Sequence, residues 1–203
     1  MPSPLYNTIA VLSLPIVSGL YRLEVEGRDR LPPRGGFVLA ANHTSNFDPW
    51  PLGLPLWPQR QLFFMAKVEL FNPVLAPILR GAGAFPIRRG QGDIESIETA
   101  ARICREGGIV AMFPEGTRRE KGLRKKFEPR PRTGSARIAL AAQVPLVPAA
   151  IKGSDRLSRL AKLRIAYGEP VPVEDLEGLT PREAHHQATA RLMERIDALY
   201  AAL

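Results

Sequence analysis

The sequence predicts a single α/β domain with a mixed, mostly parallel central sheet flanked by helices. Three short, largely apolar runs are typical of buried strands: residues 37–41, 61–66 and 109–113. Before the third run, apolar residues recur at helical spacing in Ile94, Ile97, Ala101 and Cys104, and Gly107-Gly108 then stops the pattern. Strand, helix, strand is the order that parallel pairing requires. A length of 203 residues suits one domain with a substantial core.

The N-terminal stretch, residues 1–21, is predicted to be an apolar helical segment that precedes the main domain, residues 22–203. Between Leu5 and Tyr21 polar residues interrupt the apolar pattern, and the stretch is short for a membrane span of about 20 residues. A basic leader and a small-residue cleavage site, the marks of a secretory signal, are also missing. We expect one or two helical pieces bent at Pro15. They either lie in a membrane interface or complete the core, and the positive charge of the chain favours the interface.

The first half of the domain is predicted to present polar residues at a strand end. Residues 21–27 alternate as a half-exposed strand does, and the buried strand 37–41 delivers Asn42 and His43 to its carboxyl end, where open α/β sheets bind ligands. Strand 61–66 is also expected to be buried and ends at Lys67. The remaining expectations are a helix over 69–80, shortened or kinked by Pro73 and Pro77, and a tight glycine-bearing passage over 81–89.

The second half alternates strands and helices again. Asp93 can cap a helix, strand 109–113 leads into residues 114–119, and the very basic stretch 120–132 is expected to be a surface loop. Thr133 to Ser135 opens a further helix. Strand 144–151 contains prolines that cannot donate a ladder hydrogen bond, so we expect it at a sheet edge or irregular. A strand at 163–167 and a final helix from Thr180-Pro181, with Leu192, Ile196, Leu199 and Leu203 on one face, complete the prediction.

Charge and cysteine content narrow the classes of partner. The net charge is +8 and the isoelectric point is near 10.1, so phosphates, acidic lipids or nucleic acid are the natural partners. Charge alone does not choose among them. The single cysteine, Cys104, excludes an internal disulfide and a cysteine-based zinc cluster, which suits a reducing cytoplasmic environment, and its place in a helix predicts core packing.

The chemically most suggestive stretch is residues 41–50, in which His43 and Asp48 have four residues between them. Imidazole accepts a proton near neutrality, and a carboxylate bonded to one ring nitrogen fixes the tautomer and raises the basicity of the other. The nucleophile can then be a hydroxyl of the substrate that attacks a thioester. Along a regular helix the two side chains would lie about 140° apart, so the chain must bend near Pro49. By itself such a pair is more often structural.

Two further polar clusters suit a phosphate. Residues 113–118 place a glycine, a hydroxyl, a carboxylate and a guanidinium at the end of a buried strand. Arg88 and Arg89 offer bidentate donors after a glycine turn. Taken singly, each basic cluster is equally consistent with a solvated surface. Together with the His43 pair, three polar clusters at strand ends or glycine turns favour one site.

These residues resemble the glycerolipid acyltransferases, the family of the 1-acyl-sn-glycerol-3-phosphate acyltransferase type. The stretch 42–48 matches the family's first motif, a histidine and an aspartate separated by four residues. The second, third and fourth motifs are similar to residues 83–89, 113–118 and 144–148, in the family's order, and the similarity covers about residues 37–151. The first and third motifs are specific together, whereas the second and fourth are weak alone.

The resemblance implies an enzyme that moves a fatty acyl group from acyl-CoA or acyl carrier protein to the sn-2 hydroxyl of lysophosphatidic acid, giving phosphatidic acid. His43 is then the catalytic base, Asp48 orients it, and residues 144–148 border the acyl chain. The acceptor and its phosphate are held by Arg89 or Arg88, Glu115, Gly116, Thr117 and Arg118, with Lys67 and Arg132 as further basic residues. The resemblance implies neither a metal nor a bound cofactor, because a thioester already has a good leaving group.

Two alternatives stay open at this point. The first keeps the chemistry but uses another lysolipid acceptor, including an amino-acid-based lipid. The second is a non-catalytic protein that binds anionic lipid. Nucleic acid is not expected, because the basic stretch 120–132 contains only one aromatic residue, Phe127, for stacking. The expected location is the cytoplasmic face of the cell membrane, as a peripheral or monotopic protein.

Overall fold

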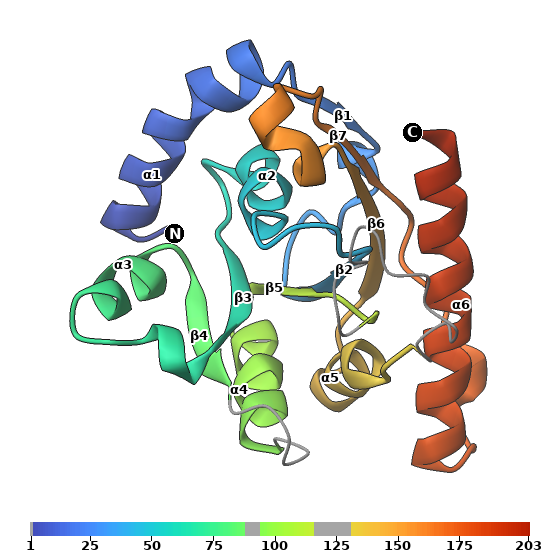
Figure 1. Cartoon of the computed structure of the whole chain (residues 1–203). Helices are drawn as coiled ribbons and strands as arrows, with labels where there is room; N and C mark the ends of the chain where they lie inside the picture. Colours follow the sequence, from blue (N-terminus) through green and yellow to red (C-terminus); the bar gives the residue numbers. More distant parts are fainter. Residues whose placement is uncertain (1, 88–93, 116–130) are drawn as a thin grey trace, which may run out of the picture.

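The computed structural model describes residues 2–87, 94–115 and 131–203, and within them the chain forms one α/β domain around a seven-stranded sheet (Figure 1). The strand order is β1-β7-β6-β2-β5-β3-β4, and every neighbouring pair is parallel except β6 with β7. The predicted mixed, mostly parallel sheet is therefore confirmed. In chain order the strands are β1 (Glu24–Glu26), β2 (Phe37–Ala41), β3 (Leu62–Lys67), β4 (Ala84–Ile87), β5 (Ile109–Met112), β6 (Leu146–Lys152) and β7 (Arg164–Tyr167).

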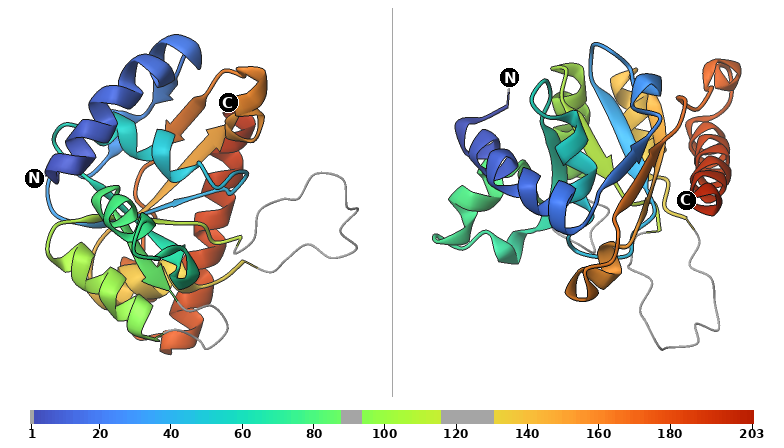
Figure 2. Two further views of the ribbon diagram at one scale, coloured as in Figure 1. Left: turned by 60° about the vertical axis from the view of Figure 1, so that its left-hand side comes forward. Right: turned by 90° about the horizontal axis from the view of Figure 1, so that it is seen from above.

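Helices cover both faces of the sheet (Figures 1 and 2). The helices α4 (Ile94–Arg105), α5 (Gly134–Ala142) and α6 (Pro181–Ala202) share one core cluster with inward side chains of the strands. The short helix α2 (Pro49–Gly53), followed by the 3₁₀ turn η3 (Leu54–Leu56), packs on the opposite face. The helix α3 (Leu75–Gly81) lies beside β4 and α1. This layered arrangement buries an apolar core on each side of the sheet.

The strand β2 lies inside the sheet, between β6 and β5, and all five of its residues are buried, as its unbroken apolar sequence predicts. Its carboxyl end delivers Asn42 and His43. Because β5, β3, β4 and β6 run parallel to it, their carboxyl ends reach the same edge of the sheet. This edge is called the carboxyl edge below, and it holds the candidate site.

The prediction that strand 144–151 lies at an edge or is irregular is wrong. The strand β6 is internal, parallel to β2 and antiparallel to β7. Pro148 is tolerated because the first residue pair of the β6–β7 ladder is Ala149 with Tyr167, so its missing N–H lies just outside that ladder. The carbonyl of Pro148 still accepts a hydrogen bond from Gly168 N at 2.9 Å.

Other boundaries also differ from expectation. The passage expected over 81–89 contains a strand, β4, which pairs with β3. Strand β3 was expected to be buried, but most of its residues are only half-buried. Gly83 enters β4 with a φ of 95°, and a Cβ there would lie 2.2 Å from Leu62 O, so a side chain is excluded. The helix expected over 69–80 begins only at Leu75, after the 3₁₀ turn η4 (Val68–Leu70). Ile94 is exposed and does not belong to the buried face of α4.

The N-terminal helix α1 (Pro4–Pro15) changes at Pro15 into a π-helical turn, η1 (Ile16–Leu20), where the sequence predicts a bend. Ala10 and Val17 pack against Leu54 and Leu163. The opposite side exposes large apolar residues: Leu5, Val11, Leu12, Leu14, Ile16 and Leu20. Across the described residues, the helices are too short or too polar to traverse a bilayer. One face of this segment thus completes the core, and the other is open to a partner. The proposed division of the chain into residues 1–21 and 22–203 stays a prediction.

Two smaller predictions are confirmed. Cys104 is buried in α4, its thiol donates to Phe37 O at 3.6 Å, and burial raises the pKa of the thiol to about 12. The last helix begins with a reciprocal capping box between Thr180 and Glu183 and buries Leu192 and Ile196. The predicted basic loop lies outside the described residues except for Pro131 and Arg132.

Candidate active site

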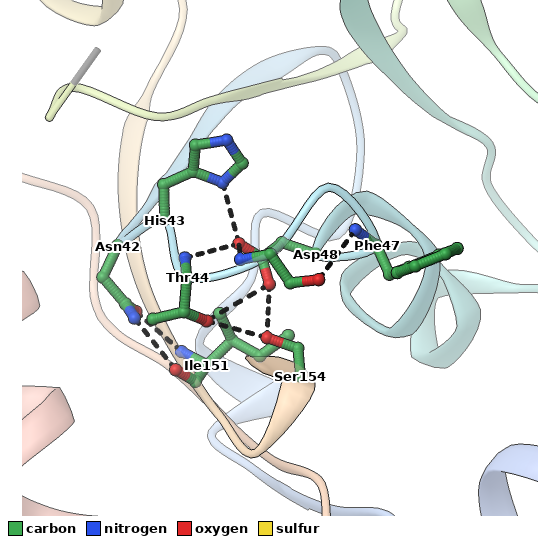
Figure 3. A network of polar contacts seen from close by, with 8 residues as sticks. Asn42, His43, Thr44, Phe47, Asp48, Ile151 and Ser154 are labelled. Atoms are coloured by element: carbon green, nitrogen blue, oxygen red, sulfur yellow. Dashed lines mark hydrogen bonds and ion pairs between the residues drawn. The ribbon is translucent and has the colours of Figure 1, made fainter. Parts of the chain in front are cut away.

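The site begins where β2 ends. Residues 42–45 have no regular structure, 46–48 form a turn, and α2 starts at Pro49, which is the bend that the His43 and Asp48 spacing requires. The bend brings His43 Nδ1 to 2.8 Å from Asp48 Oδ2 (Figure 3). Pro49 suits the first position of α2 because a helix leaves that N–H without a partner in any case. The predicted contact between the two side chains is therefore present.

Asp48 is completely buried and accepts several hydrogen bonds. Its Oδ2 accepts from the backbone N–H groups of Thr44 at 2.8 Å and Ser45 at 3.0 Å, in addition to His43. Its Oδ1 accepts from the hydroxyl of Ser154. A carboxylate surrounded by donors acts as an acceptor, so Nδ1 of His43 carries the proton and donates. The other ring nitrogen, Nε2, then holds a lone pair and can accept a proton.

The imidazole is also held by a contact on one face of its ring. The His43 ring stacks on Phe113, with centroids 4.2 Å apart and planes 21° from parallel. Phe113 follows β5, the neighbour of β2, so the sheet register brings the two rings together. The His43 side chain is 15% exposed, and its second nitrogen points away from Asp48 (Figure 3). The ring is fixed while one edge stays open to a substrate.

Asn42 extends the pairing of β2 and β6 beyond the last strand residue. Its side-chain amide donates to Ile151 O at 2.9 Å and accepts from Ile151 N at 2.8 Å. Asn42 is buried, so both polar ends of the amide are satisfied inside the protein. The amide acts as one more rung of the ladder and fixes the backbone immediately before His43.

Three of the predicted binding residues lie near strand ends. Glu115 is buried in the turn after β5. Lys67 is exposed at the end of β3, with β5 between it and β2. Arg132 is exposed, and its backbone N–H donates to Pro114 O at 2.8 Å, which ties it to the turn after β5. The other predicted binding residues, Arg88, Arg89, Gly116, Thr117 and Arg118, lie outside the described residues.

The sequence did not single out Ser154, Thr44 or Phe113 for their contacts with the catalytic pair, nor Asn42 for its bonds to Ile151. Asn42, Thr44 and Phe113 stand inside conspicuous motifs, which could have drawn attention to them. Ser154 lies 106 residues from Asp48, and no local pattern connects the two. Among the described residues there is also no group of three or more His, Cys, Asp or Glu side chains that could hold a metal ion.

Comparison with known proteins identifies the family. Residues 22–152 match the family described as Acyltransferase, a region that includes His43, Asp48 and Phe113. The chain belongs to the acyltransferase family. It is 34% identical over 181 residues to the 1-acyl-sn-glycerol-3-phosphate acyltransferase of Bacillus subtilis (strain 168), with 87% of each protein covered. It is 28% identical over 155 residues to the Streptococcus pneumoniae enzyme of that name, covering 73% of this chain and 55% of the relative.

A solved structure shares the fold. The crystal structure of the 1-acyl-sn-glycerophosphate (LPA) acyltransferase from Thermotoga maritima superimposes with a TM-score of 0.66 at 24% sequence identity. The match covers 96% of this chain and 79% of that protein. The likeness therefore extends over almost the whole of this chain.

Proposed function

We propose that this acyltransferase moves a fatty acyl group from acyl-CoA or acyl carrier protein to the free sn-2 hydroxyl of lysophosphatidic acid, forming phosphatidic acid. The observation that carries the proposal is the bond between buried Asp48 and His43 Nδ1, which leaves Nε2 as the proton acceptor. The names of the Bacillus and Streptococcus relatives support the choice of acceptor.

The reaction follows from these groups. His43 Nε2 takes the proton of the lysolipid hydroxyl while that oxygen attacks the thioester carbonyl carbon. Asp48 stabilises the imidazolium that forms. The carbon–sulfur bond then breaks, and the departing thiolate receives the proton from the imidazolium, which restores His43. No nucleophile of the protein is required, because the acceptor supplies the oxygen.

We further propose that the acceptor binds at the carboxyl edge, where Glu115, Gly116, Thr117 and Arg118 help to hold it. The guanidinium groups of Arg88 or Arg89 and of Arg118 are proposed to bind its phosphate. Guanidinium groups suit this role because they bind phosphate oxygens in pairs. Arg132 supports the proposal by position, since its backbone is bonded to Pro114 beside Glu115. Lys67, at the end of β3, is proposed as a further positive charge near the phosphate.

The test is acyl transfer by the purified protein. We expect phosphatidic acid, measured by mass spectrometry, from lysophosphatidic acid with either acyl-CoA or acyl carrier protein as donor, and comparing the two donors identifies the preferred one. Lysolipids with larger headgroups on the phosphate should react more slowly, because the headgroup replaces a charged phosphate oxygen. A faster reaction with another lysolipid would correct the acceptor. Failure of every lysolipid to consume thioester would favour a non-catalytic lipid-binding protein.

We also propose that the protein associates peripherally with the cytoplasmic face of the membrane through α1 and η1. Deleting residues 2–20 should release the protein from vesicles that contain acidic phospholipid, measured by cosedimentation. Because the deletion also removes Ala10 and Val17 from the core, the matched variant is Val11→Asp with Leu12→Asp, which changes exposed residues only. Unchanged partitioning of both proteins would contradict membrane binding through this segment.

A further inference from the structure

We propose that Ser154 is a positioning residue for the catalytic pair, acting through Asp48. Ser154 starts the 3₁₀ segment η5 (Ser154–Arg159), two residues after the end of β6. Its side chain is buried, and its hydroxyl donates to Asp48 Oδ1 (Figure 3). The proposal rests on the function proposed above, in which His43 is the base.

The protons of the two hydroxyls can be assigned. Thr44 Oγ1 lies 2.8 Å from Ser154 Oγ and 3.4 Å from Asp48 Oδ1. Each hydroxyl has one proton, and that of Ser154 is directed at the carboxylate. Thr44 is therefore the donor in its 2.8 Å contact with Ser154 Oγ, and its 3.4 Å bond to Asp48 Oδ1 is the longer of the two. The result is a hydrogen-bond chain from Thr44 to Ser154 to Asp48. Such a chain polarises the middle hydroxyl and strengthens its bond to the carboxylate.

This hydrogen-bond chain fixes the plane of the Asp48 carboxylate. The oxygen Oδ2 is held by two backbone N–H groups and by His43, and those donors come from the same short loop as Asp48 itself. Ser154 holds Oδ1 from a different part of the chain, beyond β6. With both oxygens fixed, the carboxylate cannot rotate, so the lone pair of Oδ2 stays directed at Nδ1. Ser154 thereby couples the imidazole orientation to β6.

The turn that presents Ser154 depends on glycine. Gly153 has a φ of 96°, and a Cβ at this position would lie 2.1 Å from Lys162 O. A side chain at residue 153 would therefore collide with the backbone of Lys162 and displace the turn, Ser154 included. Glycine is thus required at residue 153 on two grounds, the positive φ and the lack of space for a Cβ.

The experiment replaces Ser154 and follows the kinetics of acyl transfer. Ser154→Ala should lower kcat roughly tenfold, the size expected for one hydrogen bond to a charged group, while KM for both substrates stays within about twofold. Ser154→Thr, which keeps the hydroxyl, should recover most of the activity. The matched control is Ser13→Ala, because Ser13 is also buried but bonds only to Ile9 O within α1 among its described contacts.

A double-mutant cycle with Thr44→Val tests the chain itself. The two substitutions should be strongly non-additive in kcat, because each breaks the same hydrogen-bond chain. Wild-type kcat in Ser154→Ala, or equal losses in Ser154→Ala and Ser154→Thr, would overturn the positioning role. If the wild-type protein consumes no thioester with any lysolipid, the proposed function itself fails, so the two failures are distinguishable. Melting temperatures of all variants separate lost folding from lost turnover.

We infer, from a different observation, that the connection between β3 and β4 is a second contact with the lipid bilayer. Large apolar side chains are exposed along it: Val68, Leu70, Val74, Leu75 and Ile78. Val68 and Leu70 lie in η4, Val74 directly precedes α3, and Leu75 and Ile78 lie in α3. We call these five residues the crossover patch. This inference also rests on the proposed lipid substrate.

The helix α3, which carries part of the crossover patch, adjoins the N-terminal part of α1. Ser3 Oγ donates to Gly81 O at 3.2 Å, and a Cβ on Gly81 would lie 2.2 Å from Leu5, an exposed apolar residue of α1. Figure 1 shows α1 and α3 adjacent on one side of the molecule. The connection begins at Lys67, on the carboxyl edge, and Arg80 lies near its other end, so basic side chains flank it. Apolar side chains with flanking basic ones suit the surface of an acidic bilayer.

The test uses vesicles of phosphatidylcholine with one third phosphatidylglycerol. Val74→Asp with Ile78→Asp should lower the partition coefficient roughly tenfold or more, since several buried methyl or methylene groups are lost from the interface. The control is Leu160→Asp with Leu179→Asp, exposed apolar residues elsewhere, and it should bind like the wild type. Equal binding of the two double variants, or no binding by the wild type, would overturn the inference. Acyl transfer to lysolipid dispersed in detergent tests the proposed function separately.

Discussion

The His43→Ala variant is expected to lose roughly 10²- to 10⁴-fold in kcat for acyl transfer, the usual contribution of a general base. The imidazole is held by Asp48 at one nitrogen and by the Phe113 ring on its face, so its removal takes away a prepositioned proton acceptor. The Asp48 carboxylate cannot replace it, because Asp48 is buried beneath His43 and its oxygens already accept from other donors. Initial rates of thioester consumption measure the effect.

A matched control is His186→Ala, because His186 is an exposed histidine on α6, on the opposite end of the chain. It should retain wild-type kcat and KM. The fold of His43→Ala should also persist, since the residue is at a loop and the sheet contacts of β2 are made by residues 37–41 and Asn42. Turnover by His43→Ala equal to that of the wild type would show that another group removes the hydroxyl proton.

The Asp48→Asn variant is expected to lose between about 10²- and 10⁴-fold in kcat while the protein stays folded. The amide oxygen can take the place of Oδ2 and still accept from Thr44 N and Ser45 N. The amide nitrogen then faces Ser154 Oγ, which can turn its hydroxyl and accept. Most of the contacts are thus preserved, but the negative charge that stabilises the imidazolium is lost.

The measurement for Asp48→Asn combines kinetics with thermal unfolding. A large fall in kcat with a melting temperature close to the wild type would assign the loss to charge and tautomer. Asp48→Ala removes the acceptor for two backbone N–H groups and serves as the reference for a disrupted turn. A melting temperature of Asp48→Asn as low as that of Asp48→Ala would assign the loss of kcat to disruption of the turn. Retention of wild-type kcat would exclude Asp48 from catalysis.

Much of the fold followed from local patterns. The unbroken apolar runs of β2 and β5 are buried strands because an internal parallel strand has both faces covered. Proline and glycine were less informative. Pro148 suggested an edge strand, yet β6 is internal, because one missing N–H matters only if a partner strand faces it. The glycines before β4 predicted a tight turn, and the strand that follows them was not predicted. Strand β4 forms by pairing with β3, a long-range contact that no local sequence pattern indicates.

The sequence by itself determined the candidate pair, His43 and Asp48, and the requirement that the chain bend between them. It also determined which strand ends carry polar residues, because strand direction decides where those residues emerge. Only the tertiary structure decided that Phe113 stacks on the imidazole and that Ser154 reaches the far oxygen of Asp48. The physical reason is the order of strands: β5 and β6 both lie next to β2, and that adjacency brings together groups far apart in the chain.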